Sequence, residues 1–397
     1  MPLDRAADHD GRHFRRIQVY LAAVPADSTL VCFAVAAPGL ESLVGDELRS
    51  LAALHPLEVD QPEAGGVTFH TDRRGLYAAN LHLRIASRVL VRIGAFHASA
   101  FHELERHVVR LPWADFVEPG RAVEFRVTSR KSRLYHQDAV AERLAAAVAP
   151  LAGTSVADAP QEFVVRLFRD ECTVSADASG ELLHRRGYRL AVAKAPLRET
   201  LAAAMLAGAG WAGTAPLIDP MCGSGTIPIE AALLARQVPP GLHRGFAFEH
   251  WPSFERAAWE EVLAAARGRI LPQAAVRILG SDRDAGAVEA AQANAERAGV
   301  AEDIEWRRAA ISAIEPPPGP GWIVTNPPYG TRVGERKRLR DLFATLGNVA
   351  RRRCAGWEIA FLSAHAELER QTGLPLATKF DTENGGIRVR LMGARVG

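Results

Sequence analysis

The chain has 397 residues, and 48 Lys and Arg stand against 46 Asp and Glu. This near balance excludes binding of a polyanion through overall charge, so any nucleic-acid contact must come from local basic clusters. No apolar run approaches the ~18 residues of a membrane span, and the N-terminus has no signal-peptide core. The four cysteines are far apart and lack metal-ligand spacing. We therefore expect a cytoplasmic protein of two or three domains, with reduced thiols, no metal and no membrane segment.

The first half of the chain predicts small α+β units. Residues 1–28 have no clear periodicity and are expected to form a loosely ordered leader. Short apolar runs then alternate with helical patterns. The expected elements are strand 30–35, helix 40–54, strand 65–71, helix 75–83, strand 88–93, helix 101–110, strand 122–127, helix 138–148 and a hairpin of strands 161–168 and 171–176.

Two basic clusters lie in this half. The first, with Arg130, Lys131 and Arg133, stands between an expected strand and the helix that follows it. Basic side chains beside free helix N–H groups suit phosphate contact, and an exposed loop that is merely basic is an equally good interpretation. The second cluster includes Arg185 and Arg186 and closes this half of the chain.

Near residue 190 the pattern changes to alternating strands and helices. Such alternation predicts an α/β domain with a mainly parallel, doubly wound sheet, whose ligands bind at the C-terminal ends of the strands. The expected strands are 216–219, 276–281, 304–306, 322–325, 357–363 and 386–392, and the expected helices are 197–207, 226–236, 285–298 and 339–352.

A glycine-rich turn follows the first of these strands. Gly223 and Gly225 allow a sharp bend and the close approach of a ligand, and Asp219 can accept a hydrogen bond from an ammonium group. No Lys-Ser/Thr pair follows the glycines, and Pro228 replaces the third glycine of a dinucleotide fingerprint, so neither motif is complete. The turn predicts a nucleotide-like cofactor held by Asp219, Met221, Cys222, Gly223, Ser224, Gly225 and Thr226.

The next strand ends in a second acidic motif. Asp282 lies where a carboxylate can hold ribose hydroxyl groups, with Arg283 beside it. Asp284 can instead cap the helix that follows. We assign Asp282 and Arg283 to the cofactor site.

The strand 322–325 is followed by Asn326, Pro327, Pro328 and Tyr329. The side-chain carbonyl of Asn326 and the main-chain carbonyl of Pro327 can accept hydrogen bonds from one planar NH2 group, and Tyr329 offers a stacking face. A sulfonium methyl donor needs little acid–base help, so positioning and electrostatics can supply most of the catalysis. These four residues are the predicted catalytic set.

Together the motifs resemble class I S-adenosylmethionine-dependent methyltransferases, and more narrowly the bacterial RNA guanine-N2 methyltransferases with a THUMP domain. The resemblance includes Pro38-Gly39-Leu40-Glu41, Gly65-Gly66-Val67, the run His184–Arg189 and the segment Phe246–Pro252. It implies a ferredoxin-like domain that starts in 29–74, a THUMP RNA-binding region in 75–187 and a Rossmann-like methyltransferase domain in 190–397. The implied reaction is methyl transfer to the exocyclic N2 of a guanosine, most often in 23S ribosomal RNA, with Arg130, Lys131, Arg133, Arg185 and Arg186 as RNA contacts.

One departure and several alternatives remain open. The family usually has an acidic residue near the adenine amino group, whereas the stretch Trp306–Ile311 has none. Adenine recognition then depends on backbone groups, or cofactor affinity is lower. Transfer RNA is the main alternative substrate. A DNA adenine-N6 or protein glutamine-N5 methyltransferase, and a non-catalytic RNA-binding protein, are the more distant alternatives.

Overall fold

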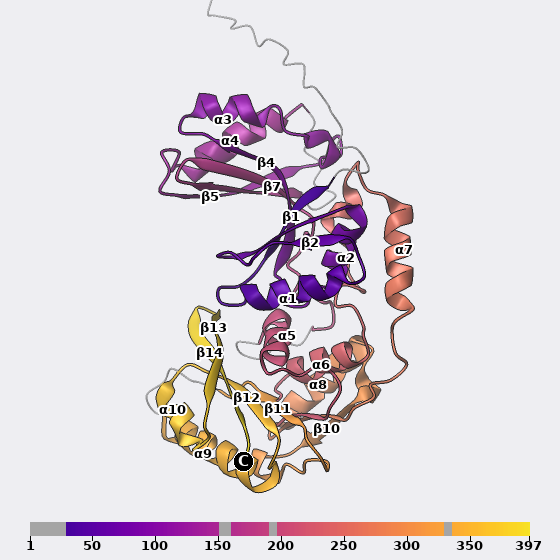
Figure 1. The fold of residues 1–397 in the computed structure, drawn as a ribbon, viewed down its shortest axis with the longest axis vertical. Helices are drawn as coiled ribbons and strands as arrows, with labels where there is room; N and C mark the ends of the chain where they lie inside the picture. The colour runs from indigo at the N-terminus through magenta and orange to yellow at the C-terminus, as the bar shows by residue number, and fades with distance from the viewer. Residues whose placement is uncertain (1–28, 151–159, 190–196, 329–335) are drawn as a thin grey trace, which may run out of the picture.

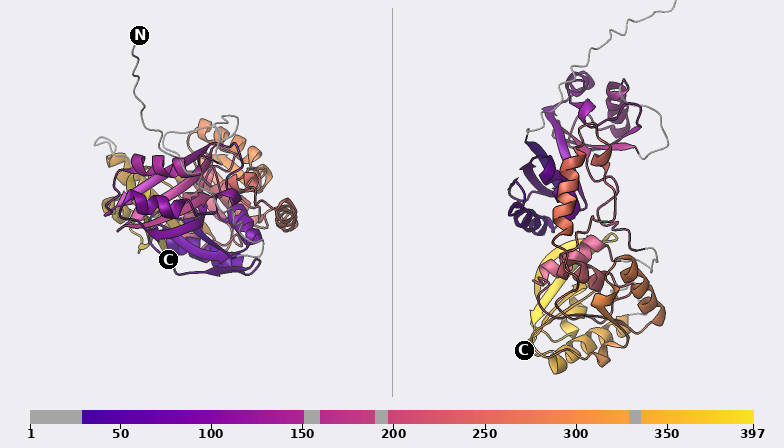
Figure 2. Two further views of the ribbon diagram at one scale, coloured as in Figure 1. Left: turned by 90° about the horizontal axis from the view of Figure 1, so that it is seen from above. Right: turned by 90° about the vertical axis from the view of Figure 1, so that its right-hand side faces the viewer.

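The computed structural model describes residues 29–150, 160–189, 197–328 and 336–397. Two lobes lie end to end along the long axis of the molecule, and each is built on a seven-stranded sheet (Figures 1 and 2). The expected leader 1–28 and Tyr329 lie outside the described residues. In the described part of the chain, no helix is long and apolar enough to cross a membrane.

A single sheet joins both α+β units expected in the N-terminal half. Its strands are β1 (Leu30–Val35), β2 (Leu57–Val59), β3 (Gly66–Thr71), β4 (Arg88–His97), β5 (Val123–Arg130), β6 (Gln161–Phe168) and β7 (Glu171–Asp177). Their order is β2-β3-β1-β4-β7-β6-β5, with β5 at one edge. Only β5 and β6 pair in parallel among these strands. The units meet where β4 pairs with both β1 and β7.

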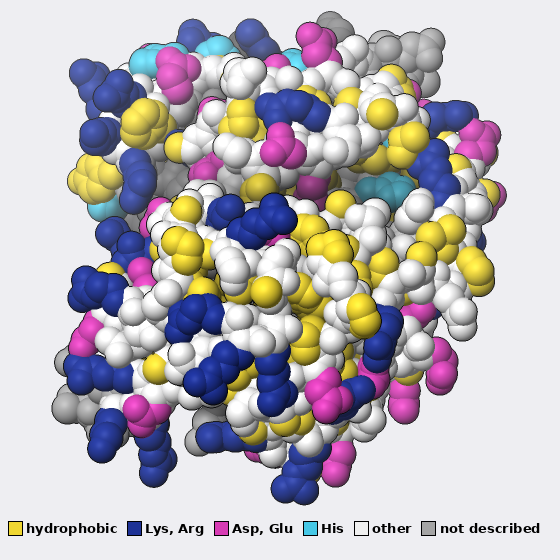
Figure 3. Space-filling model, turned by 60° about the horizontal axis from the view of Figure 1, so that its bottom comes forward, with side chains coloured by type: hydrophobic (Ala, Val, Ile, Leu, Met, Phe, Trp, Pro, Cys, Tyr) yellow, Lys and Arg dark blue, Asp and Glu magenta, His cyan; other side chains and the backbone are white. Residues whose placement is uncertain are grey.

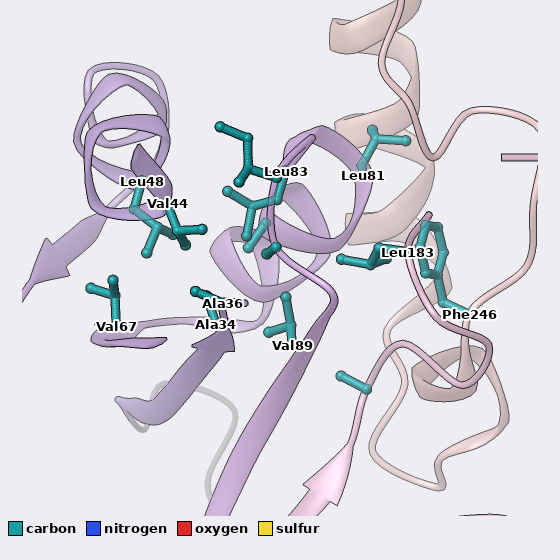
Figure 4. Packing of buried hydrophobic residues seen from close by; sticks show 14 of the residues in the cluster. Ala34, Ala36, Val44, Leu48, Val67, Leu81, Leu83, Val89, Leu183 and Phe246 are labelled. Carbon is teal, nitrogen blue, oxygen red and sulfur yellow. The ribbon is translucent and has the colours of Figure 1, made fainter. Parts of the chain in front are cut away.

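The helices of this lobe are α1 (Glu41–Ala52), α2 (Arg73–His82), α3 (Phe101–Val108) and α4 (Gln137–Val148). Strand residues alternate between a buried and a more exposed face, as in β6, where Phe163, Val165 and Leu167 are buried. Val44 and Leu48 of α1 belong to one hydrophobic cluster with Ala34 and Val67 of the sheet (Figure 4). The short strand β2 has three residues, too few for the sequence pattern to reveal it.

The C-terminal lobe has the expected doubly wound sheet. Its strands are β8 (Leu217–Asp219), β9 (Ile278–Asp282), β10 (Ile304–Arg308), β11 (Trp322–Thr325), β12 (Glu358–Ser363), β13 (Ala377–Asn384) and β14 (Ile387–Arg395), in the order β10-β9-β8-β11-β12-β14-β13. Strands β8 to β12 are parallel, and β14 runs antiparallel to β12 and β13. Because the strand order reverses at β8, the ligand crevice is expected beyond the C-terminal end of β8.

The helices of the C-terminal lobe are α5 (Glu199–Gly208), α6 (Thr226–Ala235), α7 (Arg256–Arg267), α8 (Ala285–Arg297), α9 (Arg336–Arg353) and α10 (Ala366–Gln371). The sequence patterns did not reveal α7, α10 or β13. Helix α7 belongs to a segment between α6 and β9 that packs on the N-terminal lobe (Figure 1). In this segment, the indole of Trp251 donates to Gln161 Oε1 at 2.7 Å, and Phe248 stacks on Tyr77. The N-terminal lobe therefore includes side chains from beyond residue 190.

A second contact joins the lobes at Gly39. This residue has a left-handed φ of 83°, and a Cβ atom there would lie 1.8 Å from the main-chain oxygen of Asp381 in β13. The β13–β14 hairpin is drawn in yellow in Figure 1, where it reaches toward the start of α1. Only glycine fits this position, because it has no Cβ to meet the neighbouring strand.

The substitution Gly39→Ala is expected to lower the Tm by several degrees, because it adds a steric clash to the cost of a left-handed alanine. Gly120→Ala is a matched control, since Gly120 has a φ of 87° but nothing within 4 Å of its Cβ position. That variant has only the conformational cost, on the order of 1–2 kcal/mol. Thermal unfolding compares the two, and equal losses of Tm would show that the contact with β13 does not join the lobes.

Candidate active site

The glycine turn lies between the buried strand β8 and helix α6. Gly223 and Gly225 are both left-handed, and Gly225 is the N-cap of α6. A Cβ atom at Gly225 would lie 2.7 Å from the ring of Trp306 and 2.8 Å from Cβ of Ala291, so one side of the turn is packed tightly. A Cβ atom at Gly223 would meet nothing within 4 Å. The turn therefore has open space at Gly223, and the binding of a ligand there stays a prediction.

Asp219 ends β8 and is 1% exposed. Its Oδ1 accepts hydrogen bonds from Thr325 Oγ1 at 2.6 Å and from the main-chain N–H of Met221 at 3.2 Å. Oδ2 receives no hydrogen bond from a described residue, so it is available to a ligand donor. The pKa of the Asp219 carboxyl is raised to about 7. Burial is the main cause, and the hydrogen bond from Thr325 offsets part of this rise. A cationic ligand group would stabilise the charged form of Asp219.

Asp282 connects the glycine turn to the end of β9. Its Oδ2 accepts from Gly223 N at 3.1 Å, and its Oδ1 accepts from Asp284 N at 3.0 Å. Each carboxylate oxygen has a second lone pair, so Asp282 can still accept from ribose hydroxyls. The side chain of Asp284 accepts from Gly286 N and caps α8, which confirms the capping role expected from the sequence. Arg283 is exposed beside them.

Asn326 follows β11 directly, and Thr325 before it bonds to Asp219 at the end of β8. Its Oδ1 is buried and has no hydrogen-bond partner among the described residues. An unpaired buried acceptor costs roughly 1–3 kcal/mol, and a ligand N–H can remove that cost. Pro327 is buried and Pro328 is exposed. The position of Tyr329 stays a prediction, because it lies outside the described residues.

Two side chains that support the turn were missed from the sequence. Asn294 of α8 is fully buried, and its Nδ2 donates to the main-chain oxygen of Ser224 at 3.0 Å. A lone Asn in an alanine-rich helix has no motif that could have revealed it. Trp306 packs its ring on Gly280 and Gly225, and its indole nitrogen is buried without a described partner. Asn294 and Trp306 therefore fix the shape of the turn through their contacts with Ser224 and Gly225.

The structure separates the expected RNA contacts into three kinds. Arg130, Lys131 and Arg133 are exposed around the end of β5. Arg185 is also exposed, but it pairs with Glu181 at 2.7 Å. The expectation for Arg186 is wrong, because this residue is 4% exposed and its guanidinium is bonded inside the protein. Its charge pairs with Glu230 and not with a ligand at the surface.

The site fits S-adenosylmethionine on three independent features. Asp219 offers an acceptor that favours a cation, Asp282 can hold a ribose, and Gly223 leaves space for close approach. Asn326 then lies where an amine to be methylated can be held. Within the described residues, no group of three or more His, Cys, Asp or Glu side chains could hold a metal ion.

The order of the strands, with a glycine turn where that order reverses, is typical of a Rossmann-like methyltransferase. The side-chain oxygen of Asn326, at the end of the neighbouring strand β11, can accept a hydrogen bond from an amine. Comparison of families agrees with this class. The chain belongs to the family described as RMKL-like, methyltransferase domain, whose model matches residues 186–392. Residues 31–90 match the model of the RlmL ferredoxin-like domain.

Individual relatives extend over most of the chain. A candidate RNA methyltransferase of Synechocystis sp. is 34% identical over 369 residues, which cover 91% of this chain and 95% of that protein. The ribosomal RNA large subunit methyltransferase K/L of Syntrophotalea carbinolica is 35% identical, and the match covers 92% of this chain but 53% of that protein. The solved structure of SMU.472, a candidate methyltransferase complexed with SAH, is 29% identical with a TM-score of 0.83 and covers 94% of this chain and 99% of that chain.

The pKa of Asp219 gives a testable pH dependence. If a cofactor cation binds the ionised carboxylate, the affinity for S-adenosylmethionine should fall about tenfold as the pH falls from 8 to 6, because the protonated fraction rises through a pKa of about 7. Titration calorimetry at fixed ionic strength measures this dependence.

Two variants separate this effect from titration of the ligand itself. Asp219→Asn should retain only the pH dependence of the ligand. Thr325→Val removes a hydrogen bond that lowers the pKa of Asp219, so the loss of affinity should begin at higher pH. Identical profiles for all three proteins would rule out Asp219 as the titrating group.

Proposed function

We propose that this methyltransferase transfers the methyl group of S-adenosylmethionine to the exocyclic N2 of a guanosine in ribosomal RNA. The observation that carries the proposal is the buried Oδ1 of Asn326, which has no hydrogen-bond partner among the residues that the structure describes. An exocyclic NH2 group supplies the donor that this oxygen lacks. The ribosomal substrate is supported by the name of the Syntrophotalea relative, of which this chain spans about half.

Asn326 and Pro327 position the acceptor amine in this mechanism. The two carbonyl oxygens accept the two N–H groups, which fixes the plane of the base and directs the nitrogen lone pair at the cofactor. S-adenosylmethionine supplies an electrophilic methyl group when bound. The new N–C bond forms as the S–C bond breaks, and the nitrogen then loses a proton to water. In this mechanism the ring of Tyr329 stacks on the guanine.

In this proposal the N-terminal lobe binds the RNA substrate. We retain the boundaries 29–74, 75–187 and 190–397 for a ferredoxin-like start, a THUMP RNA-binding region and the methyltransferase domain. Exposed Arg130, Lys131 and Arg133 form no ion pair with a described residue, so their charges are available to phosphates. Such an enzyme would work in the cytoplasm, where RNA is made and modified.

The substitution Asn326→Ala is expected to reduce methyl transfer by at least 100-fold, because it removes an acceptor that orients the amine. The affinity for S-adenosylmethionine should change less than about threefold, since Asp219 and Asp282 are retained. Incorporation of labelled methyl groups into total RNA measures transfer, and calorimetry measures binding. Asn348→Ala, on the exposed side of α9, is a matched control and should behave as wild type. Full activity in Asn326→Ala would remove the assigned role.

Deletion of the gene tests the substrate directly. Nucleoside mass spectrometry of purified 23S, 16S and transfer RNA should show the loss of one N2-methylguanosine from ribosomal RNA. A loss confined to transfer RNA would support the main alternative. A loss of N6-methyladenine from DNA, with the RNA unchanged, would overturn the proposal.

A further inference from the structure

One corner of the N-terminal lobe combines strain, exposed rings and unpaired charge. It is formed by the end of β5, the loop 131–135 and the β6–β7 hairpin, and we call it the β5–β7 corner. Arg130 pairs with Phe168 in register, and Phe168 pairs with Glu171. Since β5 is an edge strand, the corner lies at the outer edge of the sheet.

Hydrogen bonds hold the loop and the hairpin together. The main-chain N–H of Arg133 donates to Asp170 Oδ1 at 2.7 Å, and Asp170 N donates to Ser132 Oγ at 3.0 Å. Arg169 N donates to the main-chain oxygen of Arg130 at 3.3 Å. The corner is therefore an ordered surface made of two segments far apart in the sequence.

The backbone of the corner has an unusual conformation. Four described residues other than glycine have a positive φ, and three of them, Lys131, Arg169 and Asp170, lie here. Each left-handed residue costs roughly 1–2 kcal/mol, and a two-residue hairpin turn normally prefers Asn-Gly. The bonds to Asp170 explain its conformation. The side chain of Arg169 forms no hydrogen bond or ion pair with a described residue. Its guanidinium carbon lies 5.2 Å from the ring centre of Phe168.

Two aromatic rings are exposed in this corner. Tyr135 is 66% exposed, and Phe168 is 37% exposed. They are the exposed aromatic residues among the large hydrophobic side chains that the structure describes; the other two exposed residues of that kind are Leu54 and Leu271. Arg166 also lies 5.8 Å from the ring centre of Phe168. The ring of Tyr135 lies 4.1 Å from that of His136, centre to centre. The corner therefore places aromatic faces beside cations, which is the combination that binds bases and phosphates of a nucleic-acid strand.

The cations of the corner are not neutralised. Arg130, Lys131, Arg133, Arg166 and Arg169 are exposed, and none forms an ion pair with another described residue. Further along the same face of the sheet the arginines are paired, as in Arg126 with Glu162 and Arg92 with Glu63. Lys and Arg side chains are numerous along the left edge of the face shown in Figure 3, with hydrophobic side chains between them at the upper left.

We propose that the β5–β7 corner binds a single-stranded segment of the RNA substrate, with unpaired bases stacked on Phe168 and Tyr135. The arginines around the rings hold the phosphates of the same segment. Stacked bases inside a duplex have no free face for a ring, whereas unpaired bases do. Cations alone would suit either form of RNA, so the exposed rings select the single strand. This inference rests on the proposed function, which makes RNA the substrate.

The test uses the full-length protein and two fluorescein-labelled probes of roughly 16 nucleotides per strand, oligouridine and an RNA duplex. Fluorescence anisotropy measures both affinities over a series of KCl concentrations. The double variant Phe168→Ala, Tyr135→Ala should bind oligouridine about 10- to 100-fold more weakly at every salt concentration, with an unchanged salt slope. Its affinity for the duplex should stay within about twofold of wild type.

The arginines should affect the salt dependence of binding. Removal of two phosphate contacts in Arg166→Gln, Arg169→Gln should reduce the salt slope for oligouridine by about 1.4, because each contact with a single strand contributes about 0.7. Arg126→Gln is the charge control, since Glu162 already neutralises that residue. Leu271→Ala is the apolar control, because Leu271 has the same 37% exposure as Phe168. Both controls should match wild type.

Phe168→Leu and Phe168→Tyr guard against misfolding. The Phe168→Leu variant keeps apolar volume without a ring and should bind oligouridine weakly. The Phe168→Tyr variant keeps the ring and should bind oligouridine as the wild type does. Wild-type affinity in the double alanine variant, or an equal loss for oligouridine and duplex, would overturn the proposal. Methylation of total RNA by the wild type is measured in parallel. Its absence would overturn the proposed function, while the binding data would still decide whether the corner holds a single strand.

Discussion

A buried ion pair between Arg186 and Glu230 joins the two lobes and supports the helix that follows the glycine turn. Arg186 Nε lies 3.5 Å from Glu230 Oε1, which also accepts from the hydroxyl of Tyr188 at 3.0 Å. Glu230 lies in α6, the helix that begins at Gly225. Because a buried carboxylate needs a partner, the linker that carries Arg186 and Tyr188 cannot move without exposing this charge or leaving it unpaired. The position of the glycine turn therefore depends on residues outside the C-terminal sheet.

The same junction is held by arginines that bond to main-chain oxygens. Arg186 donates to the oxygens of Leu183 and Arg84, and Arg84 in turn donates to that of Val238 at 2.7 Å. Arg244 donates to the oxygens of Ser179, Glu181 and Leu182, and its burial lowers its pKa to about 10. The segment after α6 is thereby fixed to the N-terminal lobe. The lobes are coupled by specific polar contacts as well as by hydrophobic packing, so their relative orientation is strongly specified.

The regular elements and the turns that follow them could be predicted because their signals are local. Hydrophobic periodicity gave nearly all strands of the parallel sheet, and turn chemistry gave the glycines at 223 and 225 and the cap at Asp284. Arg186 was assigned wrongly to RNA, since an arginine in a basic run looks the same in sequence whether it is exposed or bonded to a buried glutamate. Asn294 and Trp306 act through tertiary contacts with the turn. The union of β1 to β7 in one sheet depends on the pairing of β4 with β7, which no local pattern reveals.

The hydrogen bond between Thr325 and Asp219 connects two motifs that lie about a hundred residues apart in the sequence. Parallel strands place their C-terminal ends at the same edge of a sheet, and β8 and β11 are direct neighbours. Thr325 occupies the last position of β11 and donates sideways to the last residue of β8. Asn326 follows Thr325 with no intervening residue, and two prolines follow Asn326. One short hydrogen bond and a backbone stiffened by two prolines therefore hold Asn326 in a fixed position relative to Asp219. If Asn326 holds the amine and Asp219 the cofactor, as proposed above, this arrangement aligns the two reacting atoms.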